Sequence, residues 1–162
     1  MKDHKENNNK LLRTVLGKFT TGVAIITCFE NNNPIGATVN SFSSVSLSPP
    51  LILWSMSNSS NTGNVFKKNR YCTVNILSCY QKNLALKFAK SSKDKFNGVK
   101  YLSNDYKAPH IENCLAYIEC SIENDYPGGD HIIFIGKVNK FYSNNSDPLI
   151  FFNGEFRKLQ DN

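Results

Sequence analysis

The chain lacks any long hydrophobic run. Its 162 residues contain no uninterrupted apolar stretch near the roughly 20 residues that a membrane-spanning helix needs. The first residues, MKDHKENNNK, are charged and polar, so they contain no apolar core of a signal peptide. We therefore expect a cytoplasmic protein with no membrane association.

The patterns typical of metal sites and of disulfide frameworks are missing too. The cysteines are odd in number and lack C-x-x-C spacing, and the three histidines (His4, His110 and His131) are isolated. Because a zinc site needs clustered Cys and His ligands, we predict no bound metal. We expect reduced and mostly buried thiols at all five cysteines: Cys28, Cys72, Cys79, Cys114 and Cys120.

A G-x-G-x-x-G fingerprint is also absent, which excludes a Rossmann dinucleotide site. What the chain does contain is a composition typical of globular proteins, with 40% hydrophobic residues, 11 Phe and 7 Tyr. There are no internal repeats, and no shift in composition marks a linker. We therefore predict one domain over residues 1–162, with a core of about residues 10–159.

Positive charge is concentrated in the middle of the chain. The net charge is +6, yet residues 61–107 alone contain ten Lys or Arg against two Asp. Such a segment can attract an anionic ligand such as a nucleotide, can bind nucleic acid, or can be a solvated lysine-rich surface. We favour the solvated surface for most of these lysines, and we expect no nucleic-acid binding because no motif for it is present.

The most informative stretch runs from Gly36 to Trp54 and reads GATVNSFSSVSLSPPLILW. Its period-two alternation predicts strands, and the continuous apolar run after Pro49-Pro50 fits a strand buried on both faces. Between them lie small hydroxyl and amide side chains, which donate hydrogen bonds and can hold an oxyanion. An ordinary serine-rich edge strand remains the alternative.

The rest of the chain predicts more strands than helices. We expect a helix over residues 10–19, a hairpin formed by residues 22–28 and 35–47, and a helix over 80–89 with Ser78 as its N-cap. Residues 90–105 look irregular, and Gly136 inside a long strand suggests a bulge. Further strands are expected at 51–55, 70–77, 114–122, 131–142 and 148–152. This count predicts a mainly β fold, a β-barrel with a few helices.

A polar loop, SNSSNT at residues 57–62, precedes a short helix expected at residues 64–69. Its residues are good helix N-caps, and a helix start beside hydroxyl groups is also a natural phosphate site. This pattern is compatible both with a loop that only caps the helix and with a loop that binds phosphate.

Several motifs recur in a fixed order along the chain: the GATVNSFSSVSLSPPL stretch, NT at 61–62, VNIL at 74–77, FA at 88–89, GDH at 129–131, IGKV at 135–138 and PLIFFNGEF at 148–156. Together they resemble the flavin reductase-like, FMN-binding split-barrel family, in particular the small reductase components of two-component flavin monooxygenases. The resemblance covers roughly residues 10–159. It implies a six-stranded split barrel, a homodimer, and a flavin bound near the subunit interface.

The resemblance also implies which residues bind the flavin, FMN or possibly FAD. Residues at 40–44 would contact the ring edge and the ribityl chain, those at 55–56 the ribityl chain or phosphate, and those at 60–62 the phosphate. The implied cofactor-binding residues are Asn40, Ser41, Phe42, Ser43, Ser44, Ser55, Met56, Ser60, Asn61, Thr62, Phe88 and Gly129. His131, in the GDH turn, would lie near the nicotinamide as the catalytic residue, although without the resemblance a structural histidine at a strand start is the better interpretation.

The function implied is an NAD(P)H-dependent flavin reductase that passes hydride from NADH or NADPH to FMN or FAD and supplies reduced flavin to a partner oxygenase. The flavin itself accepts the hydride, so the protein contributes orientation and electrostatics and no nucleophile. The alternative is a flavin-binding electron-transfer protein on the same barrel without direct NAD(P)H activity.

Overall fold

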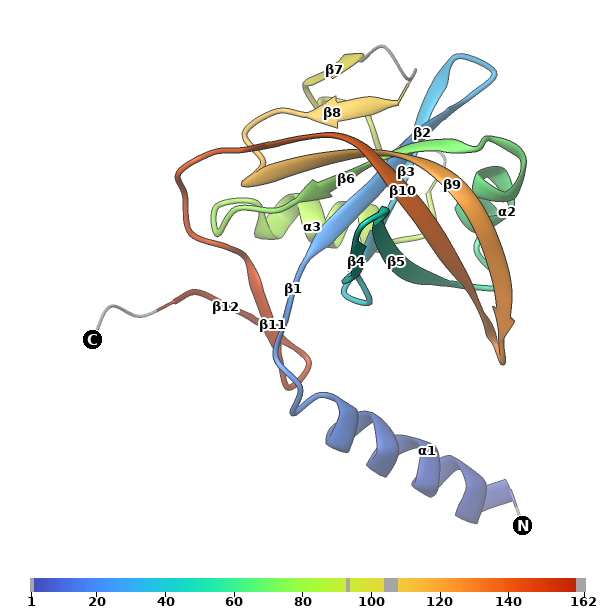
Figure 1. The fold of residues 1–162 in the computed structure, drawn as a ribbon. Coiled ribbons are helices and arrows are strands. Elements are labelled where there is room, and N and C mark those ends of the chain that lie inside the picture. The colour runs from blue at the N-terminus through green and yellow to red at the C-terminus, as the bar shows by residue number, and fades with distance from the viewer. Residues whose placement is uncertain (1, 93, 104–107, 160–162) are drawn as a thin grey trace.

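The structure, a computed structural model, describes residues 2–92, 94–103 and 108–159 (Figure 1). Strands dominate these residues, as the sequence predicts. In chain order the elements are α1 (Lys2–Leu16), β1 (Thr21–Gly22), β2 (Ala24–Glu30), β3 (Asn33–Val39), β4 (Ser43–Leu47), β5 (Pro50–Ser57), α2 (Asn61–Lys68), β6 (Tyr71–Ile76), α3 (Lys82–Ala89), β7 (Tyr101–Ser103), β8 (Pro109–Ile111), β9 (Ala116–Gly128), β10 (His131–Ser143), β11 (Ile150–Phe152) and β12 (Glu155–Arg157).

Seven strands form one antiparallel sheet in the order β3-β2-β6-β9-β10-β5-β4. The sheet curls around its core (Figure 1). As a result the chain just after β3 contacts β5, which lies near the other end of the strand order. There the Ser41 hydroxyl donates to the Ser55 carbonyl and accepts from the Ser55 N–H, both at 3.0 Å. These two bonds tie the end of β3 to β5 and leave a barrel that is split along the rest of β3.

The barrel core is built around three fully buried aromatic rings. Trp54 of β5 stacks on Phe134 of β10 with ring centroids 5.4 Å apart, and Phe66 of α2 meets both rings edge-on. Edge-to-face and offset contacts of this kind stabilise a core beyond the area they bury. They also help to fix α2 against the barrel, where Gly63 and Phe66 are its buried residues and Val65 packs on the core.

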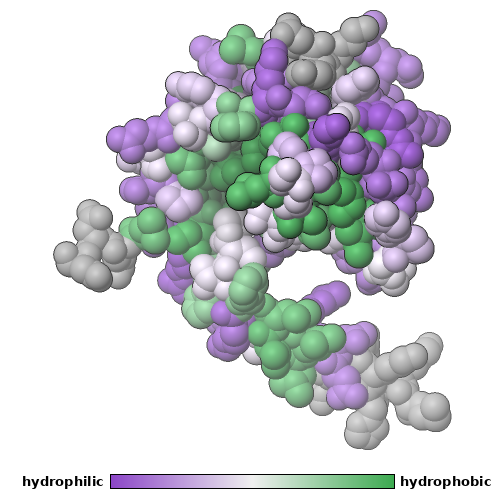
Figure 2. Space-filling view, in the orientation of Figure 1, coloured by the Kyte–Doolittle hydropathy of each residue, from purple (hydrophilic) through white to green (hydrophobic). Residues whose placement is uncertain are grey.

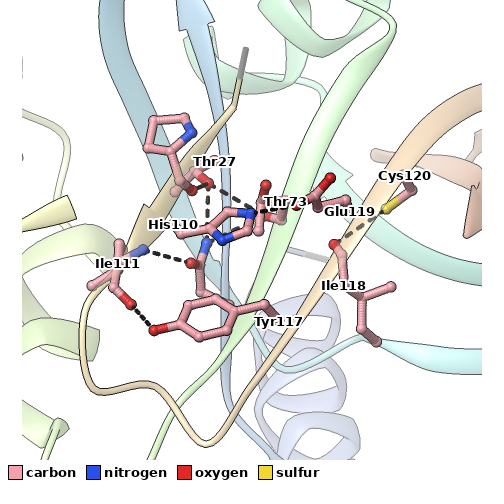
Figure 3. Close-up of polar contacts among 10 residues, drawn as sticks. Thr27, Thr73, His110, Ile111, Tyr117, Ile118, Glu119 and Cys120 are labelled. Atoms are coloured by element: carbon pink, nitrogen blue, oxygen red, sulfur yellow. Dashed lines mark hydrogen bonds and ion pairs between the residues drawn. The ribbon is translucent and has the colours of Figure 1, made fainter. Parts of the chain in front are cut away.

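A second buried region is polar, and we call it the buried polar cluster: Thr27, Thr73, Asn75, His110 and Glu119 (Figure 3). The Asn75 carboxamide donates to the Ile25 carbonyl and to the Thr27 hydroxyl, each at 3.0 Å, and accepts from the Ile111 N–H at 2.8 Å. These bonds tie β6 to β2 and to β8. They stabilise the fold because buried polar groups are costly unless hydrogen-bonded.

The histidine of this cluster is held on two sides. His110 Nε2 lies 3.1 Å from Glu119 Oε1, and its ring stacks on Tyr117 with centroids 4.9 Å apart. Burial lowers the pKa of His110, and this effect outweighs the attraction of the Glu119 carboxylate, which alone would raise it.

The stretch from Gly36 to Trp54 differs from the expectation in two respects. The hairpin partner of β2 ends at Val39, and Ser43–Leu47 forms a separate strand, β4, at the opposite edge of the sheet. In β5 the residues Ile52, Trp54 and Met56 are buried while their neighbours are only half-buried. The prediction of burial on both faces was therefore wrong, because one face of β5, with Leu51, Leu53, Ser55 and Ser57, remains partly exposed.

Some local predictions were also wrong. Ser78 is not an N-cap, since α3 begins after Gln81, and the Ser78 N–H instead donates to Gln81 Oε1 at 3.0 Å. Residues 101–103, expected to be irregular, form β7, which pairs with β8. Gly136 does lie at a register shift between β9 and β10, which confirms the bulge.

All five cysteines are buried and free, as expected. Within the described ranges no three His, Cys, Asp or Glu side chains lie close enough to hold a metal ion. No helix in these ranges is long and apolar enough to cross a membrane.

Helix α1 projects away from the barrel (Figure 1). Its apolar stripe therefore contacts none of the core and faces solvent, and Figure 2 shows these side chains gathered along the helix. The exposed stripe and the residue that follows it are Leu11, Leu12, Val15, Leu16 and Phe19.

Candidate functional site

A groove of about 1290 Å³ runs along the split in the barrel. Its floor is the whole of β3 and the two residues beyond it, because every residue from 33 to 41 lines it. At about 3.3 Å per residue this floor is roughly 25 Å long. One wall is α2 with the loop before it, and the other is the end of α3 with the segment that follows it.

One end of the groove lies where β5 and β10 pair. Ser57 of β5 is opposite His131 of β10, and both line the groove together with Ser55 and Met56. The two hydrogen bonds between the Ser41 hydroxyl and the Ser55 backbone hold the floor and this end at a fixed distance. We call this part the His131 end of the groove.

The start of α2 opens into the groove. Ser60 is the N-cap, and its hydroxyl accepts from the Gly63 N–H at 3.2 Å. The next two side chains, Asn61 and Thr62, make no hydrogen bond to any described residue and line the groove. A helix start with free hydroxyl and amide groups favours a bound anion through its N–H groups and its dipole.

The opposite wall packs tightly against β3. The Thr38 hydroxyl donates to the Ala85 carbonyl at 2.7 Å, and Phe88 lies over Gly36 so closely that a Cβ there would come within 3.0 Å of the ring. Glycine is required at position 36 for this approach. The result is a fully buried aromatic ring packed behind the middle of the floor.

Lys95 fastens the same wall. Its ammonium donates to the Gly36 carbonyl at 3.1 Å and to the Phe88 carbonyl at 2.9 Å. Burial lowers the pKa of this lysine. The two bonds connect β3, the last turn of α3 and the segment after α3.

His131 pairs with its neighbour in the turn. Its Nδ1 lies 2.6 Å from Asp130 Oδ1, and the hydrogen bond to His131 lowers the pKa of the exposed Asp130 carboxyl. This pairing orients the imidazole so that Nε2 is the ring nitrogen left for a ligand. The Asp130 carbonyl and the Gly129 carbonyl accept from Asn58, which joins this turn to the loop before α2.

Most of the residues expected at the site meet in this groove, although β3, β5, α2, α3 and β10 lie far apart in the sequence. Those that line it are Asn40, Ser41, Ser55, Met56, Ser60, Asn61, Thr62, Phe88 and His131. Four expected residues lie outside its lining: Phe42, Ser43, Ser44 and Gly129. Phe42 packs on the barrel core, the two serines lie on the exposed edge strand β4, and Gly129 supports the His131 turn through its carbonyl.

Sequence reasoning did not select the three lysines that line the groove: Lys68, Lys90 and Lys95. All three belong to the basic segment 61–107, most of which was expected to be solvated surface. The concentration of charge indicated the region, but nothing in the sequence separates Lys68, which lines the groove, from Lys67, which does not.

The chain matches known proteins along almost its whole length. The family model of the flavin reductase like domain matches residues 16–160. The FMN reductase (NADH) SmoA of Agrobacterium fabrum is 38% identical over 152 residues, which are 94% of this chain and 87% of SmoA. The reductase subunit HsaB of a flavin-dependent monooxygenase in Rhodococcus jostii is 33% identical, over 91% of this chain and 76% of HsaB.

A solved structure shares both the fold and the sequence similarity. The NADH:FAD oxidoreductase SgcE6 of Streptomyces globisporus, in complex with NAD and FAD fragments, superposes with a TM-score of 0.91 at 35% identity. The match covers 95% of this chain and 94% of that one.

Proposed function

Because this chain belongs to the flavin reductase like domain family, we propose that it is an NADH-dependent flavin reductase, which passes a hydride from the nicotinamide to FMN or FAD. The observation that carries the proposal is the groove along β3. It brings a free hydroxyl and amide pair at the start of α2 together with His131 and with backbone along the floor. Residues of β5 and β10 and the start of α2, which are distant in the sequence, line the same groove.

The groove fits a flavin nucleotide in size and in chemistry. Small-molecule sites commonly have volumes of about 300–1,000 Å³, and this groove, at about 1290 Å³, exceeds that range. Its lining is apolar at Val39 of the floor and at Met56 of the His131 end, while its rim is rich in hydroxyl and amide groups. A flat aromatic ring system with a polar, phosphorylated tail matches such a lining.

In this proposal the residues at the start of α2 hold the phosphate. The N–H groups of the first turn, with the side chains of Asn61 and Thr62, donate to it, and Ser60 keeps the helix start in place. Asn40 and Ser41 border the ring edge at the His131 end, where N–H donors stabilise negative charge that develops on the ring. The bound flavin supplies the hydride-accepting chemistry.

His131 is proposed to orient the nicotinamide nucleotide. Its Nδ1 is engaged by Asp130, so Nε2 is available to donate to or accept from a ligand group at this end of the groove. Hydride transfer requires no general base, and we assign His131 a role in binding and orientation. Proximity and orientation of the two rings would then supply most of the rate gain.

We further propose that the protein is a homodimer and delivers reduced flavin to a partner oxygenase. The apolar stripe on α1 supports the dimer, because an isolated helix of this length is only marginally stable in water and a second copy of the chain would cover it. The partner oxygenase is supported by relatives named as reductase subunits of flavin-dependent monooxygenases.

The test is anaerobic absorbance at the flavin band after the protein is mixed with FMN or FAD and then with NADH. We expect rapid, protein-dependent bleaching. Flavin binding without bleaching would contradict the reductase and favour an electron-transfer protein, whereas absence of flavin binding would contradict the site itself.

The variant His131→Ala separates orientation from structure. We expect the KM for NADH to rise about tenfold, because the variant loses roughly one hydrogen bond to a charged or polar group of the ligand. The flavin Kd should be unchanged and is the internal control. An unchanged KM would mean that His131 only supports the turn between β9 and β10.

A further inference from the structure

The turn that presents His131 contains two adjacent glycines. Gly128 ends β9, and Gly129 follows it with a φ of 73°, in the left-handed region. Glycine restricts the backbone less than any other residue, so this turn needs contacts from elsewhere in the fold to hold one conformation. The direction of the His131 side chain depends on that conformation, because β10 begins at His131, directly after the turn.

The pairing of Asp130 with His131 does not by itself fix the imidazole in the groove. The side chain of Asp130 is 94% exposed and that of His131 is 45% exposed. Exposed pairs of this kind contribute little, because water competes for both partners and both side chains lose rotational freedom. The two residues are also neighbours in the chain, so the pair moves together with the backbone of the turn.

Asn58 supplies contacts that hold this backbone. It is the first residue after β5, whose last residue, Ser57, is opposite His131. The Asn58 N–H donates to the Asp130 carbonyl at 2.9 Å, and its carboxamide donates to the Gly129 carbonyl at 3.1 Å. One residue therefore holds two consecutive carbonyls of the turn.

The loop that contains Asn58 is closed by hydrogen bonds of its own. The Ser60 N–H donates to the Ser57 carbonyl at 2.9 Å, and the hydroxyls of Ser57 and Ser59 lie 2.8 Å apart. Ser60 is also the N-cap of α2. The turn before His131 is therefore tied to the start of α2, a fixed element of the fold.

Asn58 itself is exposed and does not line the groove, whereas Ser57, Ser59 and His131 do line it. An effect of Asn58 on a ligand in the groove must therefore pass through the residues that it holds. From these contacts we infer that Asn58 is a positioning residue for the nicotinamide nucleotide: it fixes the turn so that His131 stays directed at the groove. The inference rests on the proposed function, since it states what the proposed role of His131 depends on.

The test compares two exposed asparagines near the same turn. Asn58→Ala removes the bond to the Gly129 carbonyl, and Asn124→Ala makes the same change on β9 at a side chain without a partner among the described residues. The KM and kcat for NADH are measured at saturating FMN, and the Kd of FMN is measured by fluorescence quenching. Circular dichroism melting of both variants verifies that the fold is intact.

We expect Asn58→Ala to raise the KM for NADH about fivefold, because one of the two bonds to the turn is lost and the bond from the Asn58 N–H remains. The kcat should fall by less than about twofold, and the Kd of FMN should be unchanged. Asn124→Ala should change none of the three quantities.

A double-mutant cycle separates positioning from a general structural role. If Asn58 acts through His131, adding Asn58→Ala to His131→Ala should raise the KM for NADH by less than about 1.5-fold over His131→Ala alone. A role independent of His131 would multiply the two separate effects, to about 50-fold over the unmodified protein.

Other results overturn the inference in distinct ways. An unchanged KM in Asn58→Ala, together with a raised KM in His131→Ala, would overturn it and leave the proposed function intact. A raised Kd of FMN in Asn58→Ala would assign Asn58 to the loop before α2, and multiplied effects in the cycle would make it a structural residue only. If the unmodified protein does not reduce FMN with NADH, the proposed function fails and the inference fails with it.

Discussion

The buried polar cluster and the groove contain similar side chains but differ in what those side chains bond. In the cluster, the Asn75 carboxamide and the Thr27 hydroxyl are bonded to neighbouring strands, with the shortest contact, from Thr27 to the Pro109 carbonyl, at 2.6 Å (Figure 3). In the groove, the side chains of Asn40, Asn61 and Thr62 have no partner among the described residues.

This difference separates residues that stabilise the fold from residues that are available to a ligand. A buried polar group that is bonded within the protein contributes to the native state and is costly to remove. A polar group that lines a groove without a protein partner contributes little to folding and retains its full hydrogen-bonding capacity. Changes in the two regions should therefore separate stability from binding.

The largest effect is expected from Asn75→Ala in the buried cluster. The change leaves the Ile111 N–H without its partner in a fully buried site and removes the side-chain bonds to the Ile25 carbonyl and the Thr27 hydroxyl, and we expect a loss of about 3 kcal/mol in the free energy of unfolding. Thermal melting should show Tm lowered by about 10 °C. The flavin Kd of the remaining folded protein should be unchanged; a large change in it would mean that the two regions are coupled.

A smaller effect, and of the opposite kind, is expected from Thr62→Val in the groove. Valine keeps the shape and removes the hydroxyl, so we expect the flavin Kd to rise about tenfold while Tm shifts by less than about 2 °C. Titration of flavin fluorescence and a melting curve measure the two quantities on one sample. Unchanged affinity would remove Thr62 from the phosphate site, and a large drop in Tm would place it among the residues that hold the fold.

The smallest effect concerns pH and His110. The pKa of His110 is lowered in the folded protein, so the unfolded chain binds the proton more readily and stability falls as the pH drops below about 6.5. Urea unfolding at pH 5.5, 6.5 and 7.5 should show this decline, and His110→Gln should flatten it. An equal pH dependence in both proteins would assign the decline to other titrating groups.

Much of the fold follows from local sequence patterns. The patterns in residues 114–122 and 131–142 predict two strands, which the structure pairs as β9 and β10, although β9 continues to Gly128 through most of the turn expected at residues 126–130. The helix at residues 61–68 was expected from its N-capping loop, although it begins three residues earlier than predicted. Ser78 was expected to be a cap from its residue type, and that failed because α3 begins after Gln81 and the Ser78 hydroxyl donates to the Asn113 carbonyl instead.

The site was less predictable than the fold. Residues Asn61, Thr62 and His131 were selected through the resemblance to a family, and the groove does bring them together. Ser43 and Ser44 belong to the same motif as Asn40 and Ser41, yet the chain turns away after Ser41 and places them on the opposite edge of the sheet. Adjacency in the sequence did not give adjacency in the site.

By itself the sequence determined most of the strands, the hairpin of β2 and β3 and the family, because backbone periodicity and turn residues act over a few positions. The tertiary structure alone decided which polar side chains bond one another and which face open space. Asn75 and Asn61 are the same residue type, and only the packing of β2, β6 and β8 around the first gives it partners. Whether a polar group is satisfied depends on strands that are distant in sequence, and local patterns contain no information about that distance.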